Sequence, residues 1–160
     1  MRRGLKFMVL FFIICFAMGT IHVSAADERV GTVVDGSLLT DEDHAEGVIY
    51  PLARGSFLCR GTGGLQIVAG RTFSVSGSTA CYQTVDSLNV TLYVQHLSGS
   101  TWVTDYVIPT KTAYNTYYVS TSTRKSVSGG HYYRVAGTHV AKLDGKTESI
   151  YSYSNGIWVY

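Results

Sequence analysis

The chain has 160 residues, with 13 lysines and arginines, 11 aspartates and glutamates and a formal net charge of +2. Three of the basic residues, Arg2, Arg3 and Lys6, stand at its very start, so the chain without them carries 10 basic and 11 acidic side chains. That balance excludes long-range attraction to nucleic acid or to an anionic membrane, and the length suits one domain.

The first 25 residues predict a secretory signal peptide. The three basic residues precede an apolar run of twelve, residues 7–18, and the segment ends on Val23, Ser24 and Ala25. A cationic start, a short apolar core and small residues at a cleavage site are typical of such a peptide, whereas a membrane-spanning helix needs about 20 apolar residues. We therefore expect a secreted, extracellular protein with no stable membrane insertion after cleavage.

Residues 26–54 differ in composition from the rest of the chain. Residues 41–47 form a charged run without aromatic side chains, which is typical of a mobile, solvated segment. Clustered carboxylates can hold a calcium ion, but the spacing here fits no EF-hand loop. We expect a flexible acidic N-terminal arm and no metal site.

From residue 55 onward, apolar and polar side chains alternate. In residues 72–81, Phe73, Val75 and Cys81 alternate with serines and threonines, and residues 87–97 repeat the pattern. A period of two predicts strands with one buried face. Further strands are predicted over residues 56–60, 102–108 (ended by Pro109), 131–142, 147–154 and 157–160.

Glycine-containing turns separate these segments, as at Gly99, at Gly129-Gly130, at Asp144-Gly145 and at Asn155-Gly156. An Asp-Gly pair between two strands is a strong hairpin signal. About seven strands joined by short turns predict an all-β domain over residues 55–160, a small antiparallel β-sandwich.

One tyrosine favours a particular kind of sandwich. Tyr133 follows a turn and lies two residues before the apolar Val135. This placement resembles the tyrosine corner of immunoglobulin-like and fibronectin type III-like domains, in which the hydroxyl bonds to upstream backbone. We therefore favour an immunoglobulin-like sandwich over a jelly roll or a small barrel.

Cys59 and Cys81 are the cysteines outside the predicted signal peptide, and both are in phase with apolar neighbours. An even pair in an oxidising compartment predicts one disulfide, worth about 3 kcal/mol on the chain-entropy model. The alternative is a pair of free, buried thiols.

The residue patterns of catalysis and metal binding point to no site. No serine stands in a Gly-x-Ser-x-Gly elbow. His131 and His139 are too far apart on one strand to share an ion, and His44 and His96 are isolated from both. The sequence does not pair the acids of the strand-rich region across a cleft; they are Asp86, Asp105, Asp144 and Glu148. We expect surface histidines and no catalytic residue, metal ligand or cofactor.

The 12 tyrosines and 2 tryptophans suggest binding, because many are flanked by Ser, Thr or Asn. Tyrosine offers rigid, amphipathic contact area at a low entropic cost. It is also an ordinary strand former, so half of these rings would face the core. The candidate face for a cell-wall glycan or a protein partner consists of Trp102, Tyr132, Tyr151, Tyr153 and Trp158.

Six segments carry a resemblance to a known family: residues 75–80, 82–86, 90–95, 130–137, 144–149 and 155–157. Together they resemble an uncharacterised family of small secreted proteins from Gram-positive bacteria. The similarity spans roughly Ser56 to Tyr160 and implies no activity and no functional residue.

The sequence favours a secreted, non-enzymatic binding module that acts outside the cell or at its surface. One alternative is a small secreted effector of the bacteriocin type. Such effectors are mostly cationic and amphipathic, and this chain is not. The other alternative is a hydrolase whose site is assembled only in the tertiary structure.

Overall fold

The computed structural model describes residues 38–54 and 56–160, which form an all-β domain without a helix. The predicted all-β class is confirmed, and no helix in these two ranges is long and apolar enough to cross a membrane. The predicted signal peptide, residues 1–25, and residues 26–37 lie outside the described residues. The strands are β1 (Leu39–Thr40), β2 (His44–Ile49), β3 (Leu58–Ala69), β4 (Thr72–Ser98), β5 (Thr101–Ser126), β6 (His131–Leu143), β7 (Lys146–Tyr153) and β8 (Gly156–Val159).

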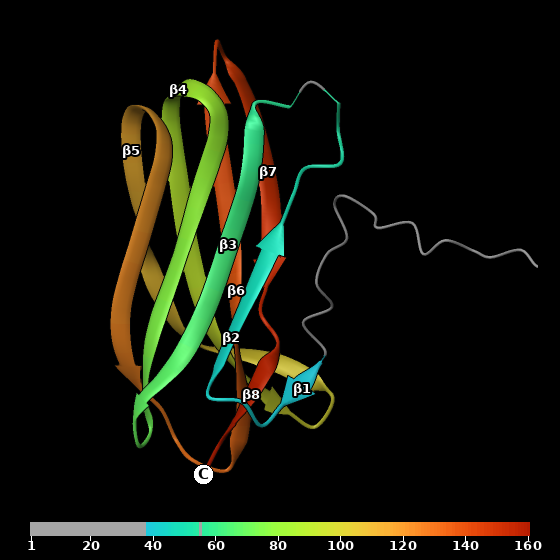
Figure 1. Ribbon diagram of the computed structural model, residues 1–160, viewed down its shortest axis with the longest axis vertical. Coiled ribbons are helices and arrows are strands. Elements are labelled where there is room, and N and C mark those ends of the chain that lie inside the picture. The colour runs from blue at the N-terminus through green and yellow to red at the C-terminus, as the bar shows by residue number, and fades with distance from the viewer. Residues whose placement is uncertain (1–37, 55) are drawn as a thin grey trace, which may run out of the picture.

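All eight strands belong to one hydrogen-bonded sheet that curls into a half-barrel (Figure 1). Its order is β1-β8-β6-β4-β3-β2, with β5 paired to β4 and β7 paired to β6. The sheet is mixed because β1 and β8 are parallel, whereas the other pairs are antiparallel.

The two longest strands produce the curl. The first half of β4 pairs with β3 and the second half with β6, while β5 follows β4 through both halves. The register shifts between Ala80 and Val85, and Asn115 on β5 has a positive φ of 50° beside this shift. Both strands turn over the top of the molecule there and return on its other side (Figure 1).

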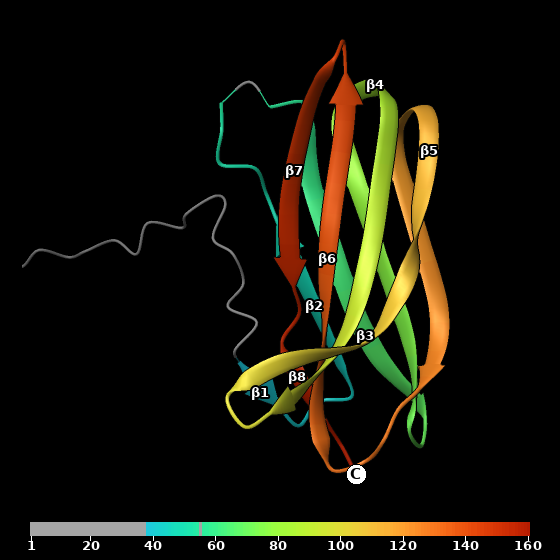
Figure 2. The ribbon, with the colours of Figure 1, turned by 180° about the vertical axis from the view of Figure 1, so that it is seen from behind.

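The two halves of the curled sheet therefore face each other across the core. The first half contains β2, β3 and the adjoining parts of β4 and β5; the second contains β6, β7, β8 and the remaining parts of β4 and β5 (Figure 2). Strand β3 contacts β6 and β7 without pairing with either. The largest fully buried side chains between the halves include Leu58, Phe73, Leu88, Leu92 and Ile157.

A buried histidine lies between the two halves. His139 Nδ1 is 2.8 Å from Thr79 Oγ1, and Nε2 is 2.8 Å from Ser152 Oγ. Because the Thr79 hydroxyl donates to the Asn89 carbonyl, it accepts the Nδ1 proton, and Nε2 accepts the proton of Ser152. The imidazole is thus satisfied in its neutral form, and burial lowers the pKa of His139 to about 4.

Glycines make room for this packing. A Cβ atom on Gly61 would lie 2.2 Å from His139 Cδ2, and one on Gly137 would lie 2.7 Å from His139 Nε2. A Cβ atom on Gly77 would lie 2.6 Å from Leu92 Cδ2, so β4 packs against itself where its two halves face each other. These positions set how closely the halves approach.

The seven-stranded immunoglobulin-like sandwich is not confirmed. Residues 38–54 and 56–160 contain eight strands, and these form one sheet because β4 and β5 continue through both halves. The prediction that Pro109 ends a strand is wrong. Among the described strands, β5 has β4 as its only hydrogen-bonded neighbour, and Pro109 lies where the register shifts between Val90 and Leu92. Proline is tolerated at an edge or a bulge because it need not donate to a ladder.

The prediction that residues 26–54 form a flexible acidic arm is wrong for the part of this segment that the structure describes. Strand β2 pairs with β3, and its Ala45, Gly47 and Ile49 are buried while the side chains between them are more exposed. A Cβ atom on Gly47 would lie 1.8 Å from the carbonyl oxygen of Tyr153, so β2 also lies against β7. The alternation of buried Ala45, Gly47 and Ile49 with the more exposed His44, Glu46 and Val48 is a strand pattern.

The predicted turns are confirmed. Asp144 and Gly145 join β6 to β7 with φ values of 49° and 73°, both positive as an Asp-Gly hairpin turn requires. Gly99, with φ of 60°, lies in the two-residue turn between β4 and β5.

The predicted disulfide is not present in the structure, in which Cys59 and Cys81 are free thiols. Leu58 pairs with Cys81 and Arg60 with Ala80, so Cys59 is the extra residue of a bulge. The bulge removes Cys59 from the alternation on which the prediction depended. Burial, followed by the charges of Glu148 and Cys59, raises the pKa of the Cys81 thiol to about 11.

Substitution of Gly61 by alanine tests the close packing around His139. We expect Gly61→Ala to lower the free energy of unfolding by about 3 kcal/mol, because a ring bonded at both nitrogens cannot yield. The control is Gly63→Ala in the same strand, where the nearest atom, Ser152 Oγ, is 3.1 Å away. It should cost about 1 kcal/mol. Equal losses in urea denaturation would contradict this account.

The buried His139 should make stability fall in acid. The unfolded chain binds a proton here below pH 6.5, whereas the folded protein binds it only near pH 4. The free energy of unfolding should therefore decrease as the pH falls from 6.5 to 4, by up to about 3 kcal/mol. His139→Gln should remove this part of the pH dependence. NMR titration should show a neutral His139 ring at pH 5; a protonated ring there would refute the assignment.

Candidate functional site

The five aromatic residues of the candidate binding face lie on the outer side of the second half of the sheet. On β6, Tyr132 and Arg134 point outward, because Tyr133 and Val135, which alternate with them, are buried. Trp158 is the cross-strand partner of Tyr132. Tyr151 and Tyr153 lie opposite Thr138 and Ala136, which continue the outward row of β6. Figure 2 views the molecule from this side.

Arg134 joins two of these rings. Its guanidinium carbon is 4.4 Å from the centre of the Trp102 ring and 4.8 Å from that of Tyr153. Its Nε donates to Gln95 Oε1 at 2.9 Å. A guanidinium held between two aromatic faces is stabilised by cation–π attraction, so Trp102, Arg134 and Tyr153 form an ordered unit.

A second group of rings continues the surface. Tyr132 and Trp158 meet edge to face, with ring centres 4.9 Å apart. Trp158 in turn meets Tyr160 at 6.3 Å. Tyr160 is 84% exposed and Tyr151 56% exposed, whereas the other rings are half-buried. Arg134 and Tyr160 were not predicted as part of this face, because no local sequence pattern shows that they adjoin the predicted rings.

We call these seven residues the aromatic face: Trp102, Tyr132, Arg134, Tyr151, Tyr153, Trp158 and Tyr160. All of its rings except Tyr151 contact a neighbouring ring or the Arg134 guanidinium, so a ligand would find most of them already ordered. Such a surface can stack against the apolar face of a sugar ring while its hydroxyl and guanidinium groups bond to the hydroxyls of that ring.

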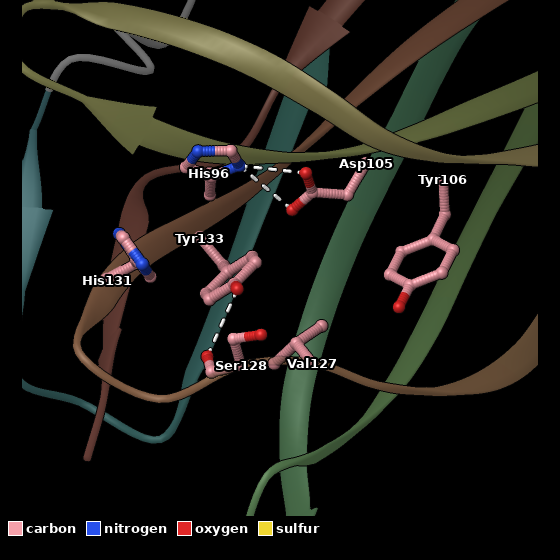
Figure 3. A pocket seen from close by; sticks show the side chains of 7 residues that line it. All are labelled: His96, Asp105, Tyr106, Val127, Ser128, His131 and Tyr133. Atoms are coloured by element: carbon pink, nitrogen blue, oxygen red, sulfur yellow. Dashed lines mark hydrogen bonds and ion pairs between the residues drawn. The ribbon is translucent and has the colours of Figure 1, made fainter.

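A separate cavity of about 300 Å³ lies on the core side of the sheet (Figure 3). Imidazoles of His96 and His131 and the ring of Tyr133 lie on one side of it, and the Tyr106 ring lies on the other. We call it the histidine cavity, and its lining residues are His96, Asp105, Tyr106, Val127, Ser128, His131 and Tyr133.

An imidazole–carboxylate pair forms part of this lining. His96 Nδ1 lies 2.8 and 3.0 Å from the two oxygens of Asp105. Asp105 is the extra residue of a bulge, since Val94 pairs with Tyr106 and Gln95 with Thr104, and a bulge re-aims a side chain in this way. A carboxylate only accepts, so Nδ1 carries the proton and Nε2 is left as an acceptor in the neutral ring.

Two predictions about histidines are wrong. His139 is a core residue rather than a surface one. His96 is not isolated from His131, because their ring centres are 5.1 Å apart. They are 35 positions apart in the chain and adjacent only because β4 and β6 pair, with His96 opposite Tyr133. Among residues 38–54 and 56–160, no three His, Cys, Asp or Glu side chains are grouped to hold a metal ion.

Tyr133 makes a contact of the tyrosine-corner type. Its hydroxyl donates to the Ser128 carbonyl, five residues upstream, at 3.1 Å, and Val135 is fully buried. Burial, with the Asp105 charge as the next cause, raises the pKa of the Tyr133 hydroxyl. Tyr133 therefore stays a hydrogen-bond donor and holds the β5–β6 turn against the histidine cavity.

Comparisons of this chain with protein-family models, with curated proteins and with solved structures find no match. The resemblance to secreted proteins of Gram-positive bacteria stays a prediction.

Proposed function

We propose that this chain is a secreted, non-enzymatic binding module that holds a cell-wall glycan on its aromatic face. The observation that carries the proposal is the gathering of the rings around Arg134, which stacks on both Trp102 and Tyr153. Sugar recognition needs an aromatic platform beside fixed hydrogen-bonding groups, and this face offers both. A protein partner is the alternative ligand, since tyrosine, tryptophan and arginine are also the residues enriched in protein interfaces.

We also propose that the framework is a variant of the immunoglobulin-like architecture. Two features support this: the bond from Tyr133 to the Ser128 carbonyl, and two halves of a sheet that pack face to face. The continuous β4 and β5 would distinguish the variant from a sandwich of two separate sheets.

Retention on wall material tests the binding proposal. The purified protein should be retained by intact Gram-positive cells and by isolated wall polymers at both low and high salt, because stacking on rings resists salt. Tyr151→Ala and Trp158→Ala should each weaken retention about five- to tenfold, since one ring contact is worth on the order of 1 kcal/mol.

The matched control is Tyr114→Ala, which removes a 71% exposed tyrosine of β5 that is not one of the seven residues of the aromatic face. Circular dichroism should show that all three variants are folded. If no wall material retains the protein, the glycan proposal fails, and a diffusing effector or a soluble protein partner becomes the better account.

A second candidate function, hydrolysis, is favoured by the His96–Asp105 pair. Asp105 fixes the Nδ1 proton, which leaves Nε2 of His96 free to accept a proton from water. The two side chains are 21% and 28% exposed, so water reaches them. If the protein hydrolyses small esters or glycosides, His96→Ala should abolish the activity. His44→Ala, which removes a histidine beside Asp43 on the surface, should leave it unchanged. Equal rates for both variants and the unaltered protein would reject catalysis at this pair.

A further inference from the structure

The last part of β5 forms a long open edge of the sheet. Among the described strands β5 pairs with β4 alone, and from Tyr118 to Ser126 it does so without a register shift. Figure 1 and Figure 2 both show this part of β5 at the margin of the described domain. The backbone groups on such an edge are a template on which another strand can pair.

The two parts of β5 differ in how this edge is protected. The first part contains Pro109 and Lys111, and its register shifts at Asp105 and again at Pro109. Proline, lysine and bulges are devices that keep edge strands from pairing with other chains. Residues 117–123 contain none of these devices, and the cations Arg124 and Lys125 come only after them. The later part of the edge is therefore open to another strand.

One hydrogen bond shows which backbone groups point away from β4. Val127 donates its N–H to the Arg71 carbonyl, so these two residues form a hydrogen-bonded pair beside the end of the β4–β5 ladder. Hydrogen-bonded and non-hydrogen-bonded pairs alternate in an antiparallel ladder. The odd-numbered residues from 119 to 127 therefore bond to β4. The residues whose N–H and C=O groups point to the open edge are Tyr118, Ser120, Ser122, Arg124 and Ser126.

This edge is complementary to the same edge of a second copy. With a two-fold axis at Thr121, antiparallel pairing brings the free backbone groups of Ser120 to those of Ser122, and those of Tyr118 to those of Arg124. Both of the latter side chains are exposed on the outer side of the sheet. Each tyrosine thus meets a guanidinium of the other copy, which is a favourable cation–π pair. No other position of the axis pairs these two residues.

The other side of the sheet is matched by the same axis. Tyr117, which is 62% exposed, comes to lie opposite Lys125 of the second copy, and Val119 opposite Thr123. The Lys125 ammonium already lies 5.4 Å from the centre of an aromatic ring of its own chain, that of Tyr106. Like charges directly opposite each other would destabilise the pairing, and this register has none.

We propose that two copies of this chain pair antiparallel through residues 117–125 of β5, about a two-fold axis at Thr121, so that their sheets join. The contact is narrow, whereas stable complexes bury about 1,600 Å². The dimer is therefore weak, with a dissociation constant on the order of 100 µM. The pairing uses none of the seven residues of the aromatic face, so a dimer has two such faces. If that face binds a wall polymer as proposed above, two linked faces strengthen retention through avidity.

Cross-linking tests the position of the axis. In the dimer, Thr121 lies opposite its own copy in a non-hydrogen-bonded pair, with Cα atoms about 4.5 Å apart. A disulfide can span that separation, so oxidised glutathione should convert the Thr121→Cys variant to covalent dimers. The control is Thr123→Cys on the same side of the strand, whose copies lie roughly 14 Å apart. It should form no more covalent dimer than the unaltered protein, which contains the free thiols of Cys59 and Cys81.

Sedimentation measures the association itself. The unaltered protein should be a monomer at about 5 µM and mostly a dimer at about 500 µM. Ser122→Pro removes an N–H that points to the open edge and that β4 does not use, so the variant should fold, as circular dichroism can show, and stay monomeric.

A monomer at every concentration of the unaltered protein, or equal cross-linking of Thr121→Cys and Thr123→Cys, would overturn the proposal. Neither measurement involves wall material. The dimer and the glycan-binding face therefore fail or stand independently.

Discussion

The structure depends on the close approach of two halves of one sheet around a buried imidazole. His139 has a hydroxyl partner on each ring nitrogen, Thr79 from β4 and Ser152 from β7. Its ring fits because Gly61 and Gly137 have no Cβ atom where the ring lies. A buried polar network of this kind is favourable only when every member is satisfied. The glycines and the network therefore have to be present together.

Strands β4 and β5 run side by side through both halves of the sheet, and we call this pair the β4–β5 ribbon. It contributes to two separate surfaces. Because the ribbon belongs to both halves, the outer side of the second half can extend from Trp102 on β5 to Tyr153 on β7 through Arg134 on β6. The same ribbon brings Asp105 to His96 and ends at the turn that Tyr133 holds. One surface is aromatic and faces outward, while the other is a small polar cavity.

The local sequence patterns predicted which segments form strands and turns, but they did not predict where the strands begin and end. The alternation in residues 72–81 and 87–97 and the Asp144-Gly145 turn correspond to the observed strand and hairpin. Pro109 and the segment that forms β2 were misread because edge position and cross-strand pairing override local preference. The disulfide prediction was wrong because strand pairing places a bulge at Cys59, and the alternation of apolar and polar residues in the sequence does not reveal that bulge.

The sequence by itself determined the all-β class and the turns, because a period of two and the turn residues are local properties. Only the tertiary structure decided the curled sheet, the position of Arg134 between two rings and the meeting of His96, Asp105 and His131. Each of these depends on which strands pair and in which register. Register is set by side chains far apart in the chain, and a bulge of one residue changes which side chains share a face.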